Sequence, residues 1–401
     1  MTITTTDVLI IGAGAAGLMC AASAGYRGRS VTVIDMGKKP ARKILISGGG
    51  RCNFTNQGTT PSNFICQNPH FVKSALSRFT ADDFIELVDR HGVNYHHKTL
   101  GQLFCDDSAQ DIVNVLLTEC EWAGVSIDLR TEVLSVSKNT EQGYLVKTSD
   151  KDYQCESLVI ASGGLTMPKL GASPIGYKVA EQFGINVLPT IAALVPFTLH
   201  DHDKKRFEGL SGISIDCLVT SEMGMSFREN ILFTHRGLSG PAILQISSYW
   251  QAGEAVTINL LPESNLQETI NTWREQQPQK SLKNLLATLF PKRFIEALIN
   301  DGTLPLKVAD KAINQLIHDE IDKLACAIHA WKIKPNGTEG YRTAEVTLGG
   351  INTDELSSKT FEAKKTKGLY FIGEVVDVTG WLGGYNFQWC WSSGWACGQV
   401  V

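Results

Sequence analysis

The sequence lacks the paired cysteines of a disulfide framework or a zinc site. Its ten cysteines stand singly along 401 residues, and no two of them form a Cys-x-x-Cys motif. Isolated cysteines of this kind are typical of reduced thiols in a cytoplasmic protein rather than of a secreted domain. His96 and His97 have no second set of ligands at metal-binding spacing. We therefore expect no metal site.

A strong charge of one sign and a membrane-spanning run are also missing. The 41 acidic and 37 basic residues leave a formal net charge of −4, which gives no electrostatic reason to expect a nucleic-acid partner. The apolar stretch 8–24 follows Asp7 rather than a basic segment and contains three spaced glycines, unlike a signal peptide or membrane helix. We expect a cytoplasmic protein with a small-molecule substrate and no nucleic-acid or membrane partner. Its oligomeric state stays open.

A glycine-rich turn is present near the start of the chain. Residues 7–11 are expected to form a buried strand, since four apolar residues follow Asp7. This strand leads into Gly12-x-Gly14-x-x-Gly17, a helix and a second strand at 31–34. Gly12 permits the tight turn, Gly14 lets the backbone approach a pyrophosphate, and Gly17 lets the helix pack close to the sheet. The helix N-terminus then presents unpaired N–H groups to the diphosphate. The pattern predicts a dinucleotide site.

Asp35 ends the second strand, eighteen residues after Gly17. A carboxylate at this place accepts hydrogen bonds from a ribose diol and disfavours a 2′-phosphate. Taken alone, Asp35 is equally well interpreted as a turn residue. The glycine spacing and the two flanking strands favour ribose binding, and therefore FAD or NAD rather than NADP.

A second glycine-rich turn lies near the other end of the chain. Residues 368–374 form a short apolar strand that contains Gly373, and Gly384 follows in the turn 383–386 before a final helix. The interior has no second complete Gly-x-Gly-x-x-Gly motif after a strand. We therefore expect one dinucleotide site, which holds the redox cofactor FAD and is completed by the C-terminal segment. The helix after Gly384 begins where it would stabilise negative charge on a reduced flavin, whereas its three tryptophans are interpreted as core.

The sequence pattern between the two glycine-rich turns changes twice. Short alternating segments begin after about residue 190 and are typical of antiparallel strands, and helical patterns follow them. We expect an α/β fold with a Rossmann-like FAD-binding domain built from both chain ends, an inserted β-barrel-like domain and a helical domain. The expected ranges are 1–190 with 350–401, 191–262 with 327–349, and 263–326.

Five segments carry a resemblance to a known family. They are Gly12-Ala-Gly-Ala-Ala-Gly, the loop 37–56 with Ser-Gly-Gly-Gly-Arg-Cys-Asn, Phe233-Thr-His-Arg-Gly-Leu-Ser-Gly-Pro, Thr343-Ala-Glu-Val-Thr-Leu-Gly-Gly, and 368–386. The chain resembles, from end to end, the YhiN/BaiN-like bacterial flavoproteins. These are described as NAD(P)/FAD-dependent oxidoreductases and as aminoacetone oxidase family FAD-binding enzymes. The resemblance implies the same three-domain fold.

The resemblance also implies which residues contact FAD. Matched by motif position, they are Ala15 and Ala16 at the pyrophosphate, Asp35 at the adenosine ribose, Lys43, Ser47 and Asn53 along the basic loop, Val133 at adenine through its backbone, and Glu374, Asp377, Asn386 and Phe387 near the phosphates and the flavin. The one visible departure is Ala41, in a loop where relatives often have glycine. It leaves these assignments unchanged.

Two further segments offer reactive side chains. The loop 47–56 either lies against the flavin edge or clamps a phosphate. Within it Cys52 follows Arg51, which would favour a thiolate, but no partner cysteine supports a redox role. His235 precedes a helix expected at Pro241, and we consider it either a proton donor or a structural turn residue.

The leading hypothesis for the function is an FAD-dependent oxidoreductase. It would pass a hydride from transiently bound NAD(P)H through FAD to a small organic substrate such as a conjugated enone. An oxygen-dependent amine oxidase of the aminoacetone type is the main alternative. A flavin-dependent RNA-modifying enzyme is a third hypothesis, and the net charge argues against it. The fourth is a flavin-binding protein without turnover.

Overall fold

The structure is a computed structural model that describes residues 3–139 and 143–401. The chain forms two compact units, Met1–Ala192 with Glu345–Val401 and Ala193–Ala344. We call the first the terminal unit, because it contains both chain ends, and the second the inserted unit.

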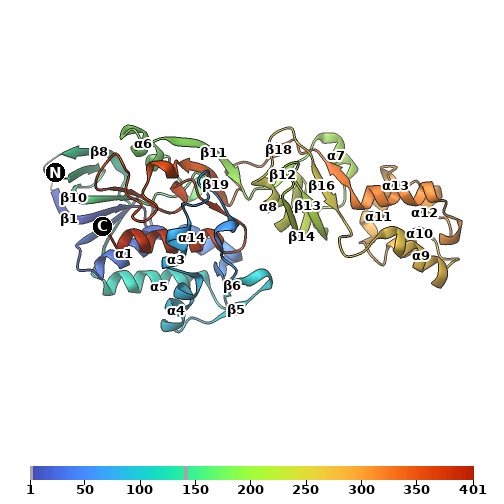
Figure 1. The fold of residues 1–401 in the computed structure, drawn as a ribbon, viewed down its shortest axis with the longest axis horizontal. Helices are drawn as coiled ribbons and strands as arrows, with labels where there is room; N and C mark the ends of the chain where they lie inside the picture. Colours follow the sequence, from blue (N-terminus) through green and yellow to red (C-terminus); the bar gives the residue numbers. More distant parts are fainter. Residues whose placement is uncertain (1–2, 140–142) are drawn as a thin grey trace. The chain divides into compact units, whose positions relative to one another are not determined.

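The terminal unit is built on a seven-stranded sheet in the order β7-β2-β1-β10-β9-β8, with β20 also paired to β10 (Figure 1). Its strands are β1 (Ile3–Ile11), β2 (Val31–Asp35), β7 (Ser126–Leu129), β8 (Val133–Asn139), β9 (Gly143–Thr148), β10 (Asp152–Ile160) and β20 (Leu369–Phe371). Strand β10 runs parallel to both β1 and β20. The N-terminal and C-terminal strands therefore belong to one sheet, and the expected α/β fold with a Rossmann-like domain from both chain ends is confirmed.

Smaller elements complete the terminal unit. Its other strands are β3 (Asn53–Asn56), β4 (Phe64–Ile65), β5 (Tyr95–His97), β6 (Gln102–Cys105), β11 (Val187–Ala193), β19 (Val346–Ile351) and β21 (Thr379–Gly380). Its helices are α1 (Ala15–Gly25), α2 (Arg42–Ile46), α3 (Lys73–Arg78), α4 (Ala81–Arg90), α5 (Ala109–Trp122), α6 (Ile175–Gln182) and α14 (Tyr385–Gly398).

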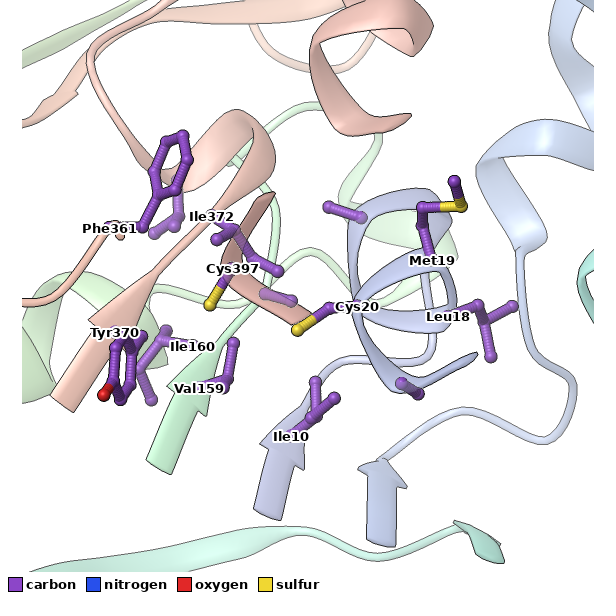
Figure 2. Close-up of a cluster of buried hydrophobic side chains, with 14 of the residues drawn as sticks. Ile10, Leu18, Met19, Cys20, Val159, Ile160, Phe361, Tyr370, Ile372 and Cys397 are labelled. Atoms are coloured by element: carbon purple, nitrogen blue, oxygen red, sulfur yellow. The ribbon is translucent and has the colours of Figure 1, made fainter. Parts of the chain in front are cut away.

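Helices α1 and α14, from opposite ends of the chain, pack directly on each other. Figure 2 shows Cys20 of α1 facing Cys397 of α14 near Ile10 and Val159, with Leu18 on another side of α1. All five side chains are fully buried. Burial of this apolar surface is the main force that holds the two ends of the chain together.

Two of the three tryptophans of α14 lie in the core, as expected, and the third, Trp395, is half-buried and packs against it. Trp389 and Trp391 are buried, and the Trp391 ring stacks on Phe84 with centroids 4.3 Å apart and ring planes 5° apart. Stacked aromatic pairs of this kind add to the gain from burial. These rings therefore fix the position of α14.

The sequence pattern of residues 125–137 predicts one strand, but the structure divides this segment in two. The run 125–137 forms β7 and β8, because Arg130 has a positive φ of 58° and turns the chain. A left-handed arginine is rare and has no sequence signature, so the alternating pattern alone did not show the break.

The inserted unit contains a seven-stranded antiparallel sheet in the order β17-β16-β13-β14-β15-β12-β18. The strands are β12 (Phe197–Thr198), β13 (Ser214–Thr220), β14 (Ser226–Phe233), β15 (Gly237–Ser239), β16 (Val256–Asn259), β17 (Trp331–Ile333) and β18 (Gly337–Thr338). The helices are α7 (Asp201–Arg206), α8 (Pro241–Ser247), α9 (Leu266–Gln276), α10 (Leu282–Leu286), α11 (Lys292–Asn300), α12 (Leu306–Ala309) and α13 (His318–His329). The strands and helices expected as two modules thus fall into one compact unit. No helix among the described residues is long and apolar enough to cross a membrane.

Candidate dinucleotide site

The turn after β1 has the close contacts that require glycine at two of its positions. Gly12 has a φ of 115°, and a Cβ there would overlap the carbonyl oxygen of Ala161 in the segment after β10. A Cβ on Gly17 would overlap the carbonyl oxygen of Gly12. These contacts let α1 begin directly beside the ends of β1 and β10.

Gly14 differs from its neighbours because the space around it is open. Its φ of −91° suits any residue, and a Cβ built on it would meet no atom within 4 Å. Gly14 is the N-cap of α1, and the first turn, which starts with Ala15 and Ala16, has neither a side-chain cap nor an acidic residue. The backbone N–H groups of this turn are therefore suited to bind an anion.

Asp35 anchors the same turn from the end of β2. Its carboxylate accepts hydrogen bonds from the N–H of Ala13 (2.9 Å) and of Gly37 (2.6 Å), and Arg42 pairs with it at 3.3 Å. The Asp35 carbonyl oxygen also accepts from the N–H of Thr131 (3.0 Å), two residues before Val133. The structure thus brings the residues expected near the adenosine end together. Their contact with a ribose or an adenine stays a prediction.

The C-terminal turn lies against the first turn of α1. Gly373 has a φ of 70°, and a Cβ on it would come within 2.8 Å of the Ala16 Cβ. Its carbonyl oxygen accepts from the Trp389 indole N–H at 3.1 Å, and its own N–H donates to the Ser393 hydroxyl at 3.2 Å. Helix α14 therefore holds this turn in place. The two glycine-rich turns of the sequence meet in space.

An ion pair lies beside the C-terminal turn. The Lys43 ammonium contacts one oxygen of Glu374 at 2.7 Å and the Thr166 hydroxyl at 3.0 Å. The other Glu374 oxygen accepts from the Thr347 N–H at 3.0 Å. Lys43 and Glu374, distant in the sequence, therefore orient each other.

The loop Ser47–Gly50 has an exposed glycine backbone. Gly48, Gly49 and Gly50 all have positive φ values, and a Cβ on either of the last two would meet nothing within 4 Å. The Ser47 hydroxyl folds back on α2, where it donates to the Ile44 carbonyl oxygen at 2.7 Å. Such a loop lets a planar or anionic ligand approach the main chain closely.

Cys52 is a structural residue of this loop. Its side chain is fully buried, and burial raises the pKa of its thiol well above the ordinary range. A thiol in that state is a poor nucleophile. The absence of a partner cysteine had already argued against a redox role, and burial gives an independent reason.

The remaining predicted residues support the start of α14. A Cβ on Gly384 would overlap the Thr55 carbonyl oxygen, and the amide groups of Asn53 and Gln102 lie 2.9 Å apart. The Asn386 amide binds both the N–H and the carbonyl oxygen of Gly380 at 2.8 Å. These contacts fix the backbone that leads into the helix.

Two other predicted residues have structural partners. Phe387 stacks on Trp391 with centroids 5.7 Å apart. The buried Asp377 carboxyl accepts from the Gln67 N–H at 2.9 Å, and burial raises its pKa. His235 lies in the inserted unit, on the exposed turn between β14 and β15, so it is not among the residues that the terminal unit brings together.

Sequence reasoning missed several residues of this site. Ser162, next to the turn after β10, has a buried hydroxyl oxygen with no hydrogen-bond partner in the described parts of the chain. Its Cα would lie 3.2 Å from a Cβ on Gly12, so its backbone borders the dinucleotide turn, whereas its hydroxyl oxygen faces Gly176 of α6. Thr166, Thr347 and Glu345 were missed as well, because only the fold brings them to Lys43.

The geometry fits FAD. The turn at Gly14 is open and precedes a helix whose first turn has no side-chain cap, and a carboxylate ends the second strand. Among the described residues, no group of three His, Cys, Asp or Glu is arranged to hold a metal ion. Fold and site together define a Rossmann-type flavoprotein of the oxidoreductase class.

Comparison with known proteins identifies the family. The HI0933-like protein Rossmann domain matches residues 6–400, and the chain belongs to this family. The chain is 60% identical over 393 residues to the ribosomal RNA dihydrouridine synthase of Escherichia coli (strain K12), across 98% of this chain and 97% of that one. It is 27% identical over 410 residues to the 3-dehydro-bile acid delta(4,6)-reductase of Clostridium scindens, across 98% of both chains.

A solved structure shares the fold. The E. coli quinol fumarate reductase FrdA with the E245Q mutation aligns with 100% of this chain and 70% of its own, at 13% identity and a TM-score of 0.50. This likeness concerns the fold alone.

Proposed function

We propose that this protein is an FAD-dependent reductase of a carbon–carbon double bond conjugated to a carbonyl group, and that its substrate is a uridine in ribosomal RNA. The observation that carries the proposal is the 60% identity, over nearly the whole chain, to a ribosomal RNA dihydrouridine synthase. Dihydrouridine differs from uridine by saturation of the C5=C6 bond, which is conjugated to the C4 carbonyl.

The more distant relative supports the same reaction class. A delta(4,6)-reductase of a 3-dehydro-bile acid acts on double bonds conjugated to a ketone. Both names therefore describe addition of hydrogen across an activated double bond. The conjugated enone expected from the sequence is common to the two, and the identity favours uridine as the one used here.

The residues of the terminal unit would hold the cofactor as follows. Gly14 and the first turn of α1 would bind the diphosphate, and Asp35 would bind the adenosine ribose. Lys43, held in place by Glu374 and Thr166, would provide a positive charge beside the reactive end of the cofactor. When bound, FAD supplies hydride transfer, with NAD(P)H as the proposed transient donor.

The net charge of −4 argued against an RNA partner, but local charge favours one. Lys38, Lys39 and Arg51 are exposed and form no ion pair within the described residues. Arg42 and Lys43, in contrast, are paired with Asp35 and Glu374. The unpaired cations of this segment are available for phosphate groups, which supports a ribosomal RNA partner in place of the small-molecule substrate.

The test uses the purified flavoprotein and ribosomal RNA from a strain that lacks the gene. With NADPH or NADH, we expect the flavin to bleach, the RNA to reoxidise it under anaerobic conditions, and one uridine to gain the mass of two hydrogen atoms. Reoxidation of the flavin by a steroid-like enone but not by RNA would indicate that the substrate is a small molecule. Bleaching by an amine but not by a nicotinamide would replace the proposal with an amine oxidase.

A further inference from the structure

Glu345 is a residue of the candidate site whose backbone, but not its side chain, helps to hold the site together. It immediately precedes β19 (Val346–Ile351), and its carbonyl oxygen accepts from the Thr166 hydroxyl at 3.3 Å. The same hydroxyl contacts the Lys43 ammonium at 3.0 Å. The Glu345 backbone is therefore tied to the cluster in which Lys43 pairs with Glu374.

The two carboxyl groups of this cluster have different surroundings. Both oxygens of Glu374 are engaged, one by Lys43 and the other by the Thr347 N–H. The Glu345 carboxyl has no hydrogen-bond or ion-pair partner in the described parts of the chain, and its residue is accessible to solvent. One carboxyl is thus structural, and the other is free to exchange a proton.

The environment of Glu345 favours its protonated form. The surrounding protein atoms desolvate the Glu345 carboxyl and raise its pKa, although part of the residue still meets solvent, and the Lys43 charge opposes the shift only in part. Two carboxyl groups with such different environments are a common arrangement for acid catalysis near neutral pH, because one of them retains its proton.

We infer that Glu345 is the proton donor of the reduction, an inference that rests on the proposed function. Hydride from the reduced flavin would add to C6, the carbon β to the C4 carbonyl, and the Glu345 carboxyl would give its proton to C5. The C5=C6 π bond breaks, two C–H bonds form, the flavin is left oxidised, and Glu345 is left as a carboxylate. Lys43 would stabilise that carboxylate until solvent returns the proton, and NAD(P)H would reduce the flavin again.

The inference predicts a pH dependence with a definite sign. The donor is active only while protonated, so the rate of substrate reduction should fall as the pH rises through the raised pKa of Glu345. The Lys43 ammonium and the Glu374 carboxylate paired to it face the same cluster. Since Glu345→Gln removes the titrating carboxyl, that variant should lose this falling limb.

The experiment compares Glu345→Gln with Glu345→Asp and with the control Glu132→Gln, which alters an exposed glutamate of the same unit. Bleaching of the holoenzyme by NAD(P)H should stay within about twofold in all three. Reoxidation by ribosomal RNA should slow at least about 100-fold in Glu345→Gln, recover in part in Glu345→Asp, and stay unchanged in the control.

A second readout does not depend on turnover. Carbon-13 NMR of glutamate-labelled holoenzyme, assigned by the signal missing in Glu345→Gln, should show the Glu345 carboxyl titrating above the ordinary glutamate pKa of about 4.3. A wild-type reoxidation rate in Glu345→Gln, or an ordinary titration, would overturn the inference. If wild-type protein leaves RNA uridine unchanged, the proposed function fails instead. In that case the same variants are assayed for reduction of a small conjugated enone. An unchanged rate in Glu345→Gln would show that Glu345 is not the proton donor.

Discussion

Gly14→Leu should give a folded protein that no longer binds FAD. Nothing in the structure lies within 4 Å of a Cβ at this position, and the φ of −91° is ordinary for leucine. The flavin-free protein should therefore unfold at the wild-type temperature. The added side chain would instead fill the space in front of α1 where the pyrophosphate is expected.

The loss of FAD affinity should be at least about 100-fold, or about 2.8 kcal/mol. It is measured by titrating flavin-free protein with FAD, with thermal unfolding of the same samples alongside. Gly337→Leu is the matched control, because that glycine also has room, with its nearest atom at 3.6 Å, but belongs to the inserted unit. Wild-type affinity in Gly14→Leu would show that the pyrophosphate does not bind in the space in front of α1.

Gly394→Leu should destabilise the terminal unit itself. A Cβ on Gly394 would lie 2.5 Å from the Ala16 carbonyl oxygen and 3.0 Å from the Met19 Cβ. Leucine would therefore force α14 away from α1, at a cost of about 3 kcal/mol, the upper part of the usual range for an overpacked core. Because α14 also holds the Gly373 turn, FAD retention should fall together with stability.

Thermal unfolding of the flavin-free protein measures this effect. We expect the midpoint to fall by about 6–12 °C, since 1 kcal/mol shifts a domain of this size by about 2–4 °C. Glu121→Leu is the control, because it adds an apolar side chain to an exposed position of α5. An unchanged midpoint in Gly394→Leu would mean that the two helices are not packed as closely as described.

Much of the fold and of the cofactor site follows from local sequence patterns. The β1–α1–β2 unit was predictable because its glycine spacing and apolar strands are contiguous. The convergence of the two chain ends was predictable because the interior has no second complete Gly-x-Gly-x-x-Gly motif after a strand. The break at Arg130 was not, since a single left-handed residue leaves no periodic signal.

The roles of individual side chains were harder to predict. Asp35 was identified from its place at the end of a strand, but its bonds to the N–H groups of Ala13 and Gly37 became visible only in the structure. Glu345 was part of a recognised motif and yet carried no signal of its own. Its relation to Lys43 depends on residues far apart in the chain that only the tertiary fold brings together.

Net charge describes the whole chain and not its local surface, so the expectation of no nucleic-acid partner stays a prediction. A total of −4 says little about a segment in which Lys38, Lys39 and Arg51 are exposed and unpaired within the described residues. Contact with RNA is governed by the local arrangement of cations, so a nearly neutral chain is compatible with a large anionic substrate.

The most direct measurement is the absorption spectrum of the purified protein, with chromatographic identification of any flavin released on denaturation. If the two chain ends form one dinucleotide site, the protein carries FAD in an equimolar amount and shows the flavin bands in the visible region. A colourless protein that takes up no added FAD would contradict the assignment of the site, and with it the reaction proposed there.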